Sequence, residues 1–152
     1  MAFTLRSYVH VPLIVDRKAI PHVDKARYRG LIMGAKLKYK EHIQTKKEQI
    51  ELKCRQMNWF IEKHSKLSLK NKILLYETMI RPVWAYACQL WACSANSNIR
   101  EIETIQKIAL RKIAQARWYE RNVDIRTELG IESLEVFVSR MYERYEERLQ
   151  NV

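Results

Sequence analysis

The sequence has few of the residues that break or turn a chain, with 3 Gly and 3 Pro among 152 residues. A turn-rich all-β fold uses many of both, so their scarcity favours long helices. The apolar run from Val11 to Val15 is short and is interrupted by Pro12. It is too short for a membrane span or for the core of a signal peptide. We therefore expect no membrane partner and an intracellular location, nuclear or cytoplasmic.

Cysteine, histidine and aspartate are scarce in ways that argue against several kinds of site. The 3 Cys have no paired spacing, which argues against a disulfide framework and for a reducing compartment. None of the 4 His stands at metal-ligand spacing from a Cys, so no zinc site is expected. The chain has neither a glycine-rich phosphate loop nor a nucleophile elbow, and Asp16, Asp24 and Asp124 are far apart. Because two-metal phosphoryl transfer needs clustered carboxylates, we expect no catalytic residues and no cofactor in this chain.

Basic residues are what the sequence has in excess, with a formal net charge of +11. Residues 1–90 hold 18 Lys or Arg against 7 Asp or Glu, whereas residues 91–152 hold 10 of each. A one-sided basic excess attracts polyanions through phosphate contacts and counterion release. It is also typical of a helical protein with solvated lysine-rich faces, so composition alone leaves both interpretations open.

The apolar pattern predicts a mainly α protein, a helical bundle preceded by a short N-terminal β-hairpin. In residues 1–33, Val11, Leu13 and Val15 alternate, a turn signal follows at 16–18, and a second strand-like run covers 28–33, so a hairpin or small meander is expected. Helical spacing of apolar residues predicts one long helix over 35–63. We accordingly divide the chain into a hairpin segment, residues 1–34, and a helical bundle, residues 35–152.

The rest of the chain predicts further helices. Ser68 can cap one helix, and Pro82 predicts a break near Arg81 followed by a second helix over 82–92. A capping box at Asn98 and Glu101, a Gly130 terminus and a Ser133 cap mark three more. The aromatic-rich residues 71–94 carry apolar side chains on nearly all sides, which predicts a buried core. An aromatic surface for a ligand is the alternative.

The lysines of the long predicted helix form a candidate site. Lys36, Lys40 and Lys47 have spacings of 4 and 7 that place them on one helix face. Lys46 and Lys53 are expected beside them. The interpretation is either a basic ridge that follows a nucleic-acid backbone or a solvated face of a core helix.

Several short motifs together resemble the C-terminal part of the reverse transcriptase of jockey-type non-LTR retrotransposons. They are "FTLR" (Phe3–Arg6), "YRG" (Tyr28–Gly30), "KLKYKEHI" (Lys36–Ile43), "SLKNKILLYETMIRPVWAYACQLW" (Ser68–Trp91), "SNI" (Ser97–Ile99), "ARWY" (Ala116–Tyr119) and "LGIESLEVF" (Leu129–Phe137). The resemblance covers nearly the whole chain, and its most specific part is residues 71–91.

The resemblance implies a role for this chain as the end of a polymerase palm followed by a helical thumb. The family's catalytic aspartates, which hold Mg²⁺, lie upstream of the part that this sequence matches. The resemblance therefore implies that this chain lacks the catalytic palm and binds template–primer nucleic acid through its basic helix face. Its primer-grip turn, Tyr-Leu-Gly in the family, corresponds to Tyr28, Arg29 and Gly30. The implied partners are nucleic acid, as an RNA–DNA or RNA duplex, and the upstream palm domain.

The sequence also departs from the family pattern. The family's Trp-x-Tyr-Gly becomes Trp84-Ala85-Tyr86-Ala87 here, and its Trp-Gly becomes Trp91-Ala92. Two alternatives to the polymerase interpretation therefore stay open. One is a helical protein–protein interaction module, and the other is the non-functional remnant of a dead element.

Overall fold

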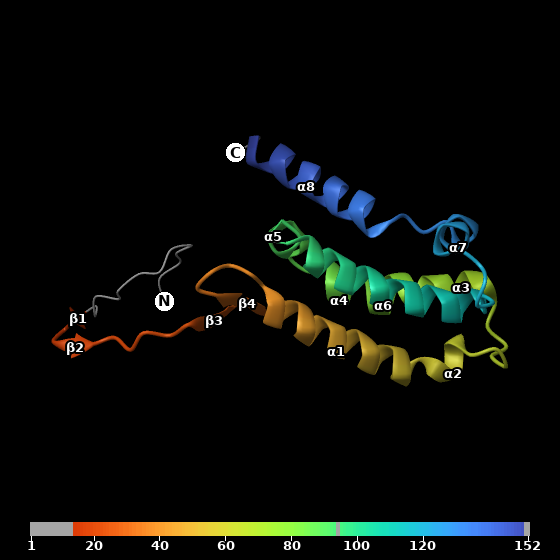
Figure 1. The fold of residues 1–152 in the computed structure, drawn as a ribbon, viewed down its shortest axis with the longest axis horizontal. Coiled ribbons are helices and arrows are strands. Elements are labelled where there is room, and N and C mark those ends of the chain that lie inside the picture. The colour runs from red at the N-terminus through yellow and green to blue at the C-terminus, as the bar shows by residue number, and fades with distance from the viewer. Residues whose placement is uncertain (1–13, 94, 151–152) are drawn as a thin grey trace.

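The computed structural model describes residues 14–93 and 95–150, and its fold is mainly α, as predicted (Figure 1). The strands are β1 (Ile14–Val15), β2 (Lys18–Ala19), β3 (Lys25–Tyr28) and β4 (Leu31–Gly34). The helical elements are α1 (Lys40–Gln56), α2 (Asn58–Ile61), α3 (Leu69–Leu75), the π-helix η1 (Tyr76–Ile80), α4 (Arg81–Ala85), α5 (Cys88–Trp91), α6 (Asn96–Ala114), α7 (Asn122–Leu129) and α8 (Leu134–Gln150).

The helices pack as a bundle around α6. Helix α1 lies along one side of α6, and α8 lies beside α5 and α6 on the other (Figure 1). The β3–β4 hairpin packs on the N-terminal end of α1, whereas α2 and α7 lie toward the opposite end of the bundle (Figure 1). The β1–β2 hairpin extends away from the helices.

The N-terminal region forms two separate antiparallel hairpins where the sequence predicted one hairpin or meander. Each has a two-residue turn whose residues both have positive φ: Asp16 and Arg17 in the first, Arg29 and Gly30 in the second. Positive φ at both positions is the geometry that matches the twist of paired strands. The predicted strand residues Val11 and Leu13, like the Phe3–Arg6 motif, lie outside the described residues.

The predicted helix over 35–63 was wrong at its start and in its continuity. Helix α1 begins at Lys40, after a loop in which Leu37 and Tyr39 have φ values of 51° and 50°. Tertiary contacts hold that loop, because the Tyr39 ring is buried and the Lys38 carbonyl accepts a hydrogen bond of 3.1 Å from Asn98 Nδ2. A turn at Met57 then separates α1 from α2. Local spacing cannot register these long-range contacts.

The predicted break at Arg81 is also corrected. The chain stays helical through Pro82 because η1 inserts a π-turn, in which the Arg81 N–H donates to the Tyr76 carbonyl. A proline cannot donate to the carbonyl four residues back, and the wider turn accommodates its ring. The interruption comes later, where Tyr86 is extended and Ala87 has a φ of 54°. Residues 82–92 are therefore two short helices, α4 and α5.

The core prediction for the aromatic-rich stretch is confirmed. Tyr76, Trp84, Cys88 and Trp91 are all buried, and the Trp84 ring meets the Phe137 ring edge-on at 4.9 Å between centroids. This core joins α1, α6 and α8, because their buried aliphatic residues belong to the same cluster.

Three of the four predicted helix caps are confirmed. The Ser68 hydroxyl accepts from the Asn71 N–H, the Ser133 hydroxyl accepts from the Val136 N–H, and Gly130 ends α7 with a φ of 65°. The capping box at Asn98 was wrong, because α6 begins two residues earlier at Asn96. The buried Asn98 side chain instead donates a hydrogen bond to the Lys38 carbonyl.

Candidate nucleic-acid interface

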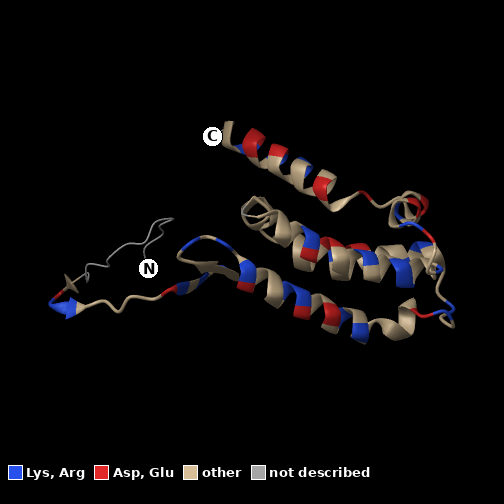
Figure 2. Cartoon of the chain, in the orientation of Figure 1, with Lys and Arg blue, Asp and Glu red and all other residues tan. Residues whose placement is uncertain are grey.

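The lysines of α1 form two rows rather than one ridge. At 100° per residue, the row of Lys40 and Lys47 lies about 120° around the helix from the row of Lys46 and Lys53. The buried stripe that includes Ile43 and Ile50 runs between the two rows. The core therefore separates the lysines into two flanks of α1. Figure 2 shows basic residues along the whole helix.

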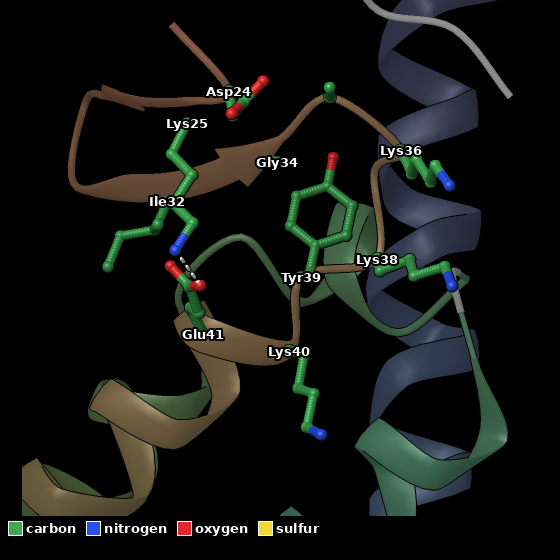
Figure 3. A pocket seen from close by; sticks show the side chains of 10 residues that line it. Asp24, Lys25, Ile32, Gly34, Lys36, Lys38, Tyr39, Lys40 and Glu41 are labelled. Atoms are coloured by element: carbon green, nitrogen blue, oxygen red, sulfur yellow. Dashed lines mark ion pairs between the residues drawn. The ribbon is translucent and has the colours of Figure 1, made fainter. Parts of the chain in front are cut away.

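Lys36 is not on the helix. It lies with Lys38 in the loop before α1, beside a hollow that is lined by Tyr39 and by residues of β3 and β4. Figure 3 shows the ammonium groups of Lys36, Lys38 and Lys40 pointing away from the Tyr39 ring, the first two to one side and Lys40 to another. The one ion pair drawn there joins Lys25 to Glu41. The wall of this hollow thus holds four lysines, counting Lys25, but it also holds Asp24 and Glu41.

The structure gathers positive charge in a second hollow, on the flank of α1 that carries Lys46. This basic cleft has a volume of about 360 Å³ and lies between the β3–β4 hairpin, α1 and the end of α4. Its lining residues are Arg27, Arg29, Gly30, Ile32, His42, Thr45, Lys46, Gln49 and Tyr86. The lining holds three cationic side chains, and none of the nine residues is acidic. The cleft thus joins two groups that the sequence predicted separately, the turn at 28–30 and the lysines of α1.

The turn at Arg29 is strained and is held in place by Tyr86. Arg29 has a φ of 45°, a conformation that costs an L-residue other than Gly about 1–2 kcal/mol. The Tyr86 hydroxyl donates to the Arg29 carbonyl, and Gly30 follows with a φ of 79°. Tyr28, the other predicted residue of the turn, is exposed and has the Arg29 guanidinium 5.6 Å from its ring centroid. Asn or Gly would fit this position without the strain, so the arginine side chain itself is the distinctive feature.

Lys46 is partly buried beside an aromatic ring and near a second cation, Arg27. Its ammonium lies 5.3 Å from the centroid of the Tyr86 ring. Burial, and then the nearby Arg27, lower the pKa of Lys46. A bound anion would reverse the effect of Arg27, because it favours the charged ammonium.

His42 is the buried floor of the same cleft. Burial, and then Lys46, lower its pKa to about 4, so the ring is neutral at physiological pH. Its Nδ1 accepts a hydrogen bond of 3.4 Å from the Ile32 N–H, which places the ring proton on Nε2. The buried Nε2 has no hydrogen-bond partner among the described residues. A neutral ring adds no charge, so the cations of the cleft act alone.

Sequence reasoning missed several members of this cleft. Arg27 had a usable signal, because it stands two residues before Arg29 and strand alternation places such residues on one side. Thr45 and Gln49 share the flank of α1 that carries Lys46. Tyr86 had no separate signal, because it belongs to a stretch whose other aromatic side chains form the core.

Among residues 14–93 and 95–150 there is no group of three or more His, Cys, Asp or Glu side chains placed to hold a metal ion. None of the described helices is both long and apolar enough to cross a membrane.

Comparison with known proteins supports the resemblance. The chain is 27% identical over 150 residues to the probable RNA-directed DNA polymerase from transposon X-element of Drosophila melanogaster, a match that covers 99% of this chain and 16% of that protein. It is 30% identical over 135 residues to the RNA-directed DNA polymerase from mobile element jockey of the same species, covering 89% of this chain and 15% of that protein. The jockey polymerase of Drosophila funebris is 28% identical over 137 residues, covering 90% and 15%. No family model and no solved structure matches the chain.

These matches define the class, because each of these relatives is an RNA-directed DNA polymerase of a mobile element. Within that class, the chain is related to the jockey-type reverse transcriptases of non-LTR retrotransposons, as its motifs indicated. It spans 15 to 17% of the length of these curated relatives.

Proposed function

We propose that this chain is a palm-end and thumb segment of the reverse-transcriptase type, which holds nucleic acid through the basic cleft and does not polymerise by itself. One observation carries the proposal. Three cations from two elements, Arg27 and Arg29 of the hairpin and Lys46 of α1, line one cleft that has no acidic residue in its wall. Such a site suits the phosphates of a duplex backbone, whose contacts position the nucleic acid without reading its sequence.

The other row of lysines on α1, Lys40 and Lys47, provides a matched control for the residues of the cleft. Removing Lys40 and Lys47, or removing Arg29 and Lys46 of the cleft, lowers the net charge by the same two units. We expect the chain to bind an RNA–DNA hybrid duplex weakly, with little sequence preference and strong salt dependence. Each lost phosphate contact should reduce the slope of log K against log salt by about 0.7–0.9.

The test measures fluorescence anisotropy of a labelled, blunt-ended hybrid at several salt concentrations. Arg29→Ala with Lys46→Ala should weaken binding and reduce the slope, whereas Lys40→Ala with Lys47→Ala should change both less. If the second pair has the larger effect, the interface lies on the other flank and the cleft is not the site. If wild type and both double variants bind the duplex equally, these basic residues are only solvated and do not contact the duplex, and the proposal fails.

The absence of polymerisation is tested separately. A primer annealed to an RNA template is incubated with the purified chain, nucleotides and Mg²⁺, and extension is measured on a gel. We expect no extension, because the two-metal reaction needs clustered carboxylates that the described residues lack. Template-dependent extension that co-purifies with the chain through several columns would contradict this.

A further inference from the structure

The chain has two tryptophans that are almost fully exposed, in contrast to the two in the core. Trp59 of α2 is 82% exposed and Trp118, in the loop between α6 and α7, is 90% exposed. An indole offers a large apolar surface that usually becomes buried in the fold or in a contact. Both belong to the end of the bundle away from the β3–β4 hairpin (Figure 1).

Two adjoining hollows shape the surface around Trp59. The first, of about 650 Å³, is lined by Trp59, Phe60 and the polar loop that leads to α3. The second, of about 620 Å³, is lined by residues of α2 and by the C-terminal turn of α6, including Lys63 and Lys112. Glu62 lines both hollows. The end of α2 and the end of α6 therefore form one hollowed surface.

Hydrogen bonds from Arg111 hold the loop that carries Trp118. The Arg111 guanidinium, at the end of α6, donates to the Glu120 carbonyl at 2.7 Å and to the Arg117 carbonyl. These bonds hold the chain on both sides of Trp118. The Trp118 ring meets the Tyr119 ring edge-on at 5.7 Å, and Arg117 donates to the Tyr119 hydroxyl. Trp118 is thus presented to solvent by an ordered loop.

Exposed basic residues lie close in the sequence to these aromatic side chains, and some of them line the two hollows. The exposed cations near them in the sequence are Lys63, Lys66, Lys70, Lys112 and Arg117. The acids among the residues described above are Glu62, which accepts from Asn58, and Glu120. The cores of protein–protein interfaces are rich in aromatic residues but poor in lysine. Aromatic rings together with lysines are the combination that proteins use to hold single-stranded nucleic acid.

We propose that this end of the bundle binds single-stranded nucleic acid, with unpaired bases stacked on Trp59 and Trp118 and with phosphates on the neighbouring cations. The proposal is independent of the basic cleft, because it uses other residues and an unpaired ligand. It goes beyond duplex holding, since it gives the chain a second contact for a strand that has left the duplex.

The test uses the 152-residue chain and labelled 12-nucleotide oligomers, oligo(U) and oligo(dT), with fluorescence anisotropy as the readout. Stacking contributes about 1–3 kcal/mol per base, so Trp59→Ala and Trp118→Ala should each weaken binding by about 5- to 150-fold. Trp→Phe at the same positions should retain part of the affinity, because a phenyl ring still stacks. The two oligomers show whether RNA or DNA is preferred.

Three controls separate stacking from other causes. An abasic oligomer with the same number of phosphates should bind much more weakly than oligo(dT), because it has no bases to stack. Arg29→Ala with Lys46→Ala should weaken binding to the blunt duplex and keep binding to the single strand. Thermal melting of the two Trp→Ala variants should match wild type, because both side chains are exposed.

The proposal is overturned by any of three results. The Trp→Ala variants bind oligo(U) and oligo(dT) as tightly as wild type, the abasic oligomer binds as tightly as oligo(dT), or the wild-type chain does not bind single strands at low salt. In the last case the exposed indoles belong to a contact with protein. Loss of duplex binding in the cleft variant alone would leave this proposal standing, so the two proposals fail separately.

Discussion

At the scale of single residues, the four tryptophans divide into two pairs with different tasks. Trp84 and Trp91 are 1% and 0% exposed, whereas Trp59 and Trp118 lie on the surface. Trp91 also uses its indole N–H, which donates to the Tyr86 carbonyl at 3.2 Å. That bond spans the interruption between α4 and α5, at the residue whose side chain supports the Arg29 turn. The same residue type thus builds the core at two positions and lies on the surface at two others.

Removing a buried indole should destabilise the fold strongly. We expect Trp84→Ala and Trp91→Ala each to lower the free energy of unfolding by about 3–5 kcal/mol, through lost burial and the cavity left behind. Urea denaturation followed by far-UV circular dichroism measures this. The matched control, Trp118→Ala, should change it by less than about 0.5 kcal/mol. A small effect at Trp84 and Trp91 would contradict their placement in the core.

His42 should make stability depend on pH. Its pKa is lowered to about 4 in the fold, so between the ordinary value near 6.5 and pH 4 the unfolded chain binds more protons than the folded chain. Stability from this group is therefore present above about pH 6.5 and is lost as the pH falls toward 4, with a slope of at most about 1.4 kcal/mol per pH unit.

The measurement is urea denaturation at pH 7, 6, 5 and 4.5. His42→Gln should flatten the dependence of the free energy of unfolding on pH in this range, because the glutamine side chain does not titrate. His64→Gln is the control, since His64 is exposed on the loop after α2. An unchanged slope in His42→Gln would show that another group causes any acid sensitivity.

At the scale of elements, the junction between α4 and α5 places the aromatic residues of the core. Ala87 adopts a φ of 54° there, at the position where the motif that this stretch resembles has Gly. A Cβ in this conformation is strained, which Gly avoids. The departure from the family pattern at Ala87 is therefore a local cost that the surrounding packing tolerates, and it leaves the reversal of the chain intact.

Restoring the glycine should stabilise the protein. We expect Ala87→Gly to raise the free energy of unfolding by about 0.5–1 kcal/mol, because relief of strain exceeds the extra entropy of the unfolded chain. Ala85→Gly is the matched control two residues earlier, in α4, where it should cost up to about 1 kcal/mol. Chemical denaturation of both variants gives the comparison. Destabilisation by Ala87→Gly would mean that the junction is not in the left-handed conformation.

At the scale of the whole molecule, the two ends of the bundle differ. The β3–β4 end carries the basic cleft, and the α2 end carries the exposed indoles with their cations. Between them lies one apolar cluster that joins β4, α1, α6 and the aromatic stretch. The β1–β2 hairpin adds nothing to that cluster, because its four strand residues are all exposed.

Hydrogen exchange should follow this arrangement. The amides of β1 and β2 should exchange almost freely, since an isolated two-stranded hairpin is marginal in water. Those of Ile102, Ile105 and Leu110 in α6 should be the slowest, because their side chains lie in the centre of the core. The amide of Leu31, whose side chain is buried, should be intermediate. Exchange of β1 as slow as that of α6 would require a contact that the described fold lacks.

Much of this molecule was decided by local sequence. The scarcity of Gly and Pro and the helical spacing of apolar residues predicted a mainly α fold, and the caps at Ser68 and Ser133 and the Gly130 terminus followed from side-chain chemistry within a few residues. The buried role of the aromatic stretch followed from apolar side chains on all of its sides. These features depend on neighbours in the chain, which is why one sequence was enough.

Tertiary structure alone decided the start of α1, the path through Pro82 and the geometry of the candidate sites. The loop before Lys40 is held by Asn98, 60 positions away from Lys38 in the sequence. The division of the lysines of α1 into two rows by Ile43 and Ile50 follows from helical spacing, whereas the start of the helix at Lys40, which leaves Lys36 outside it, does not. Tyr86 contacts Lys46 and Arg29, which are distant from it in the sequence. Contacts between residues distant in sequence set these features, and local spacing carries no record of such contacts.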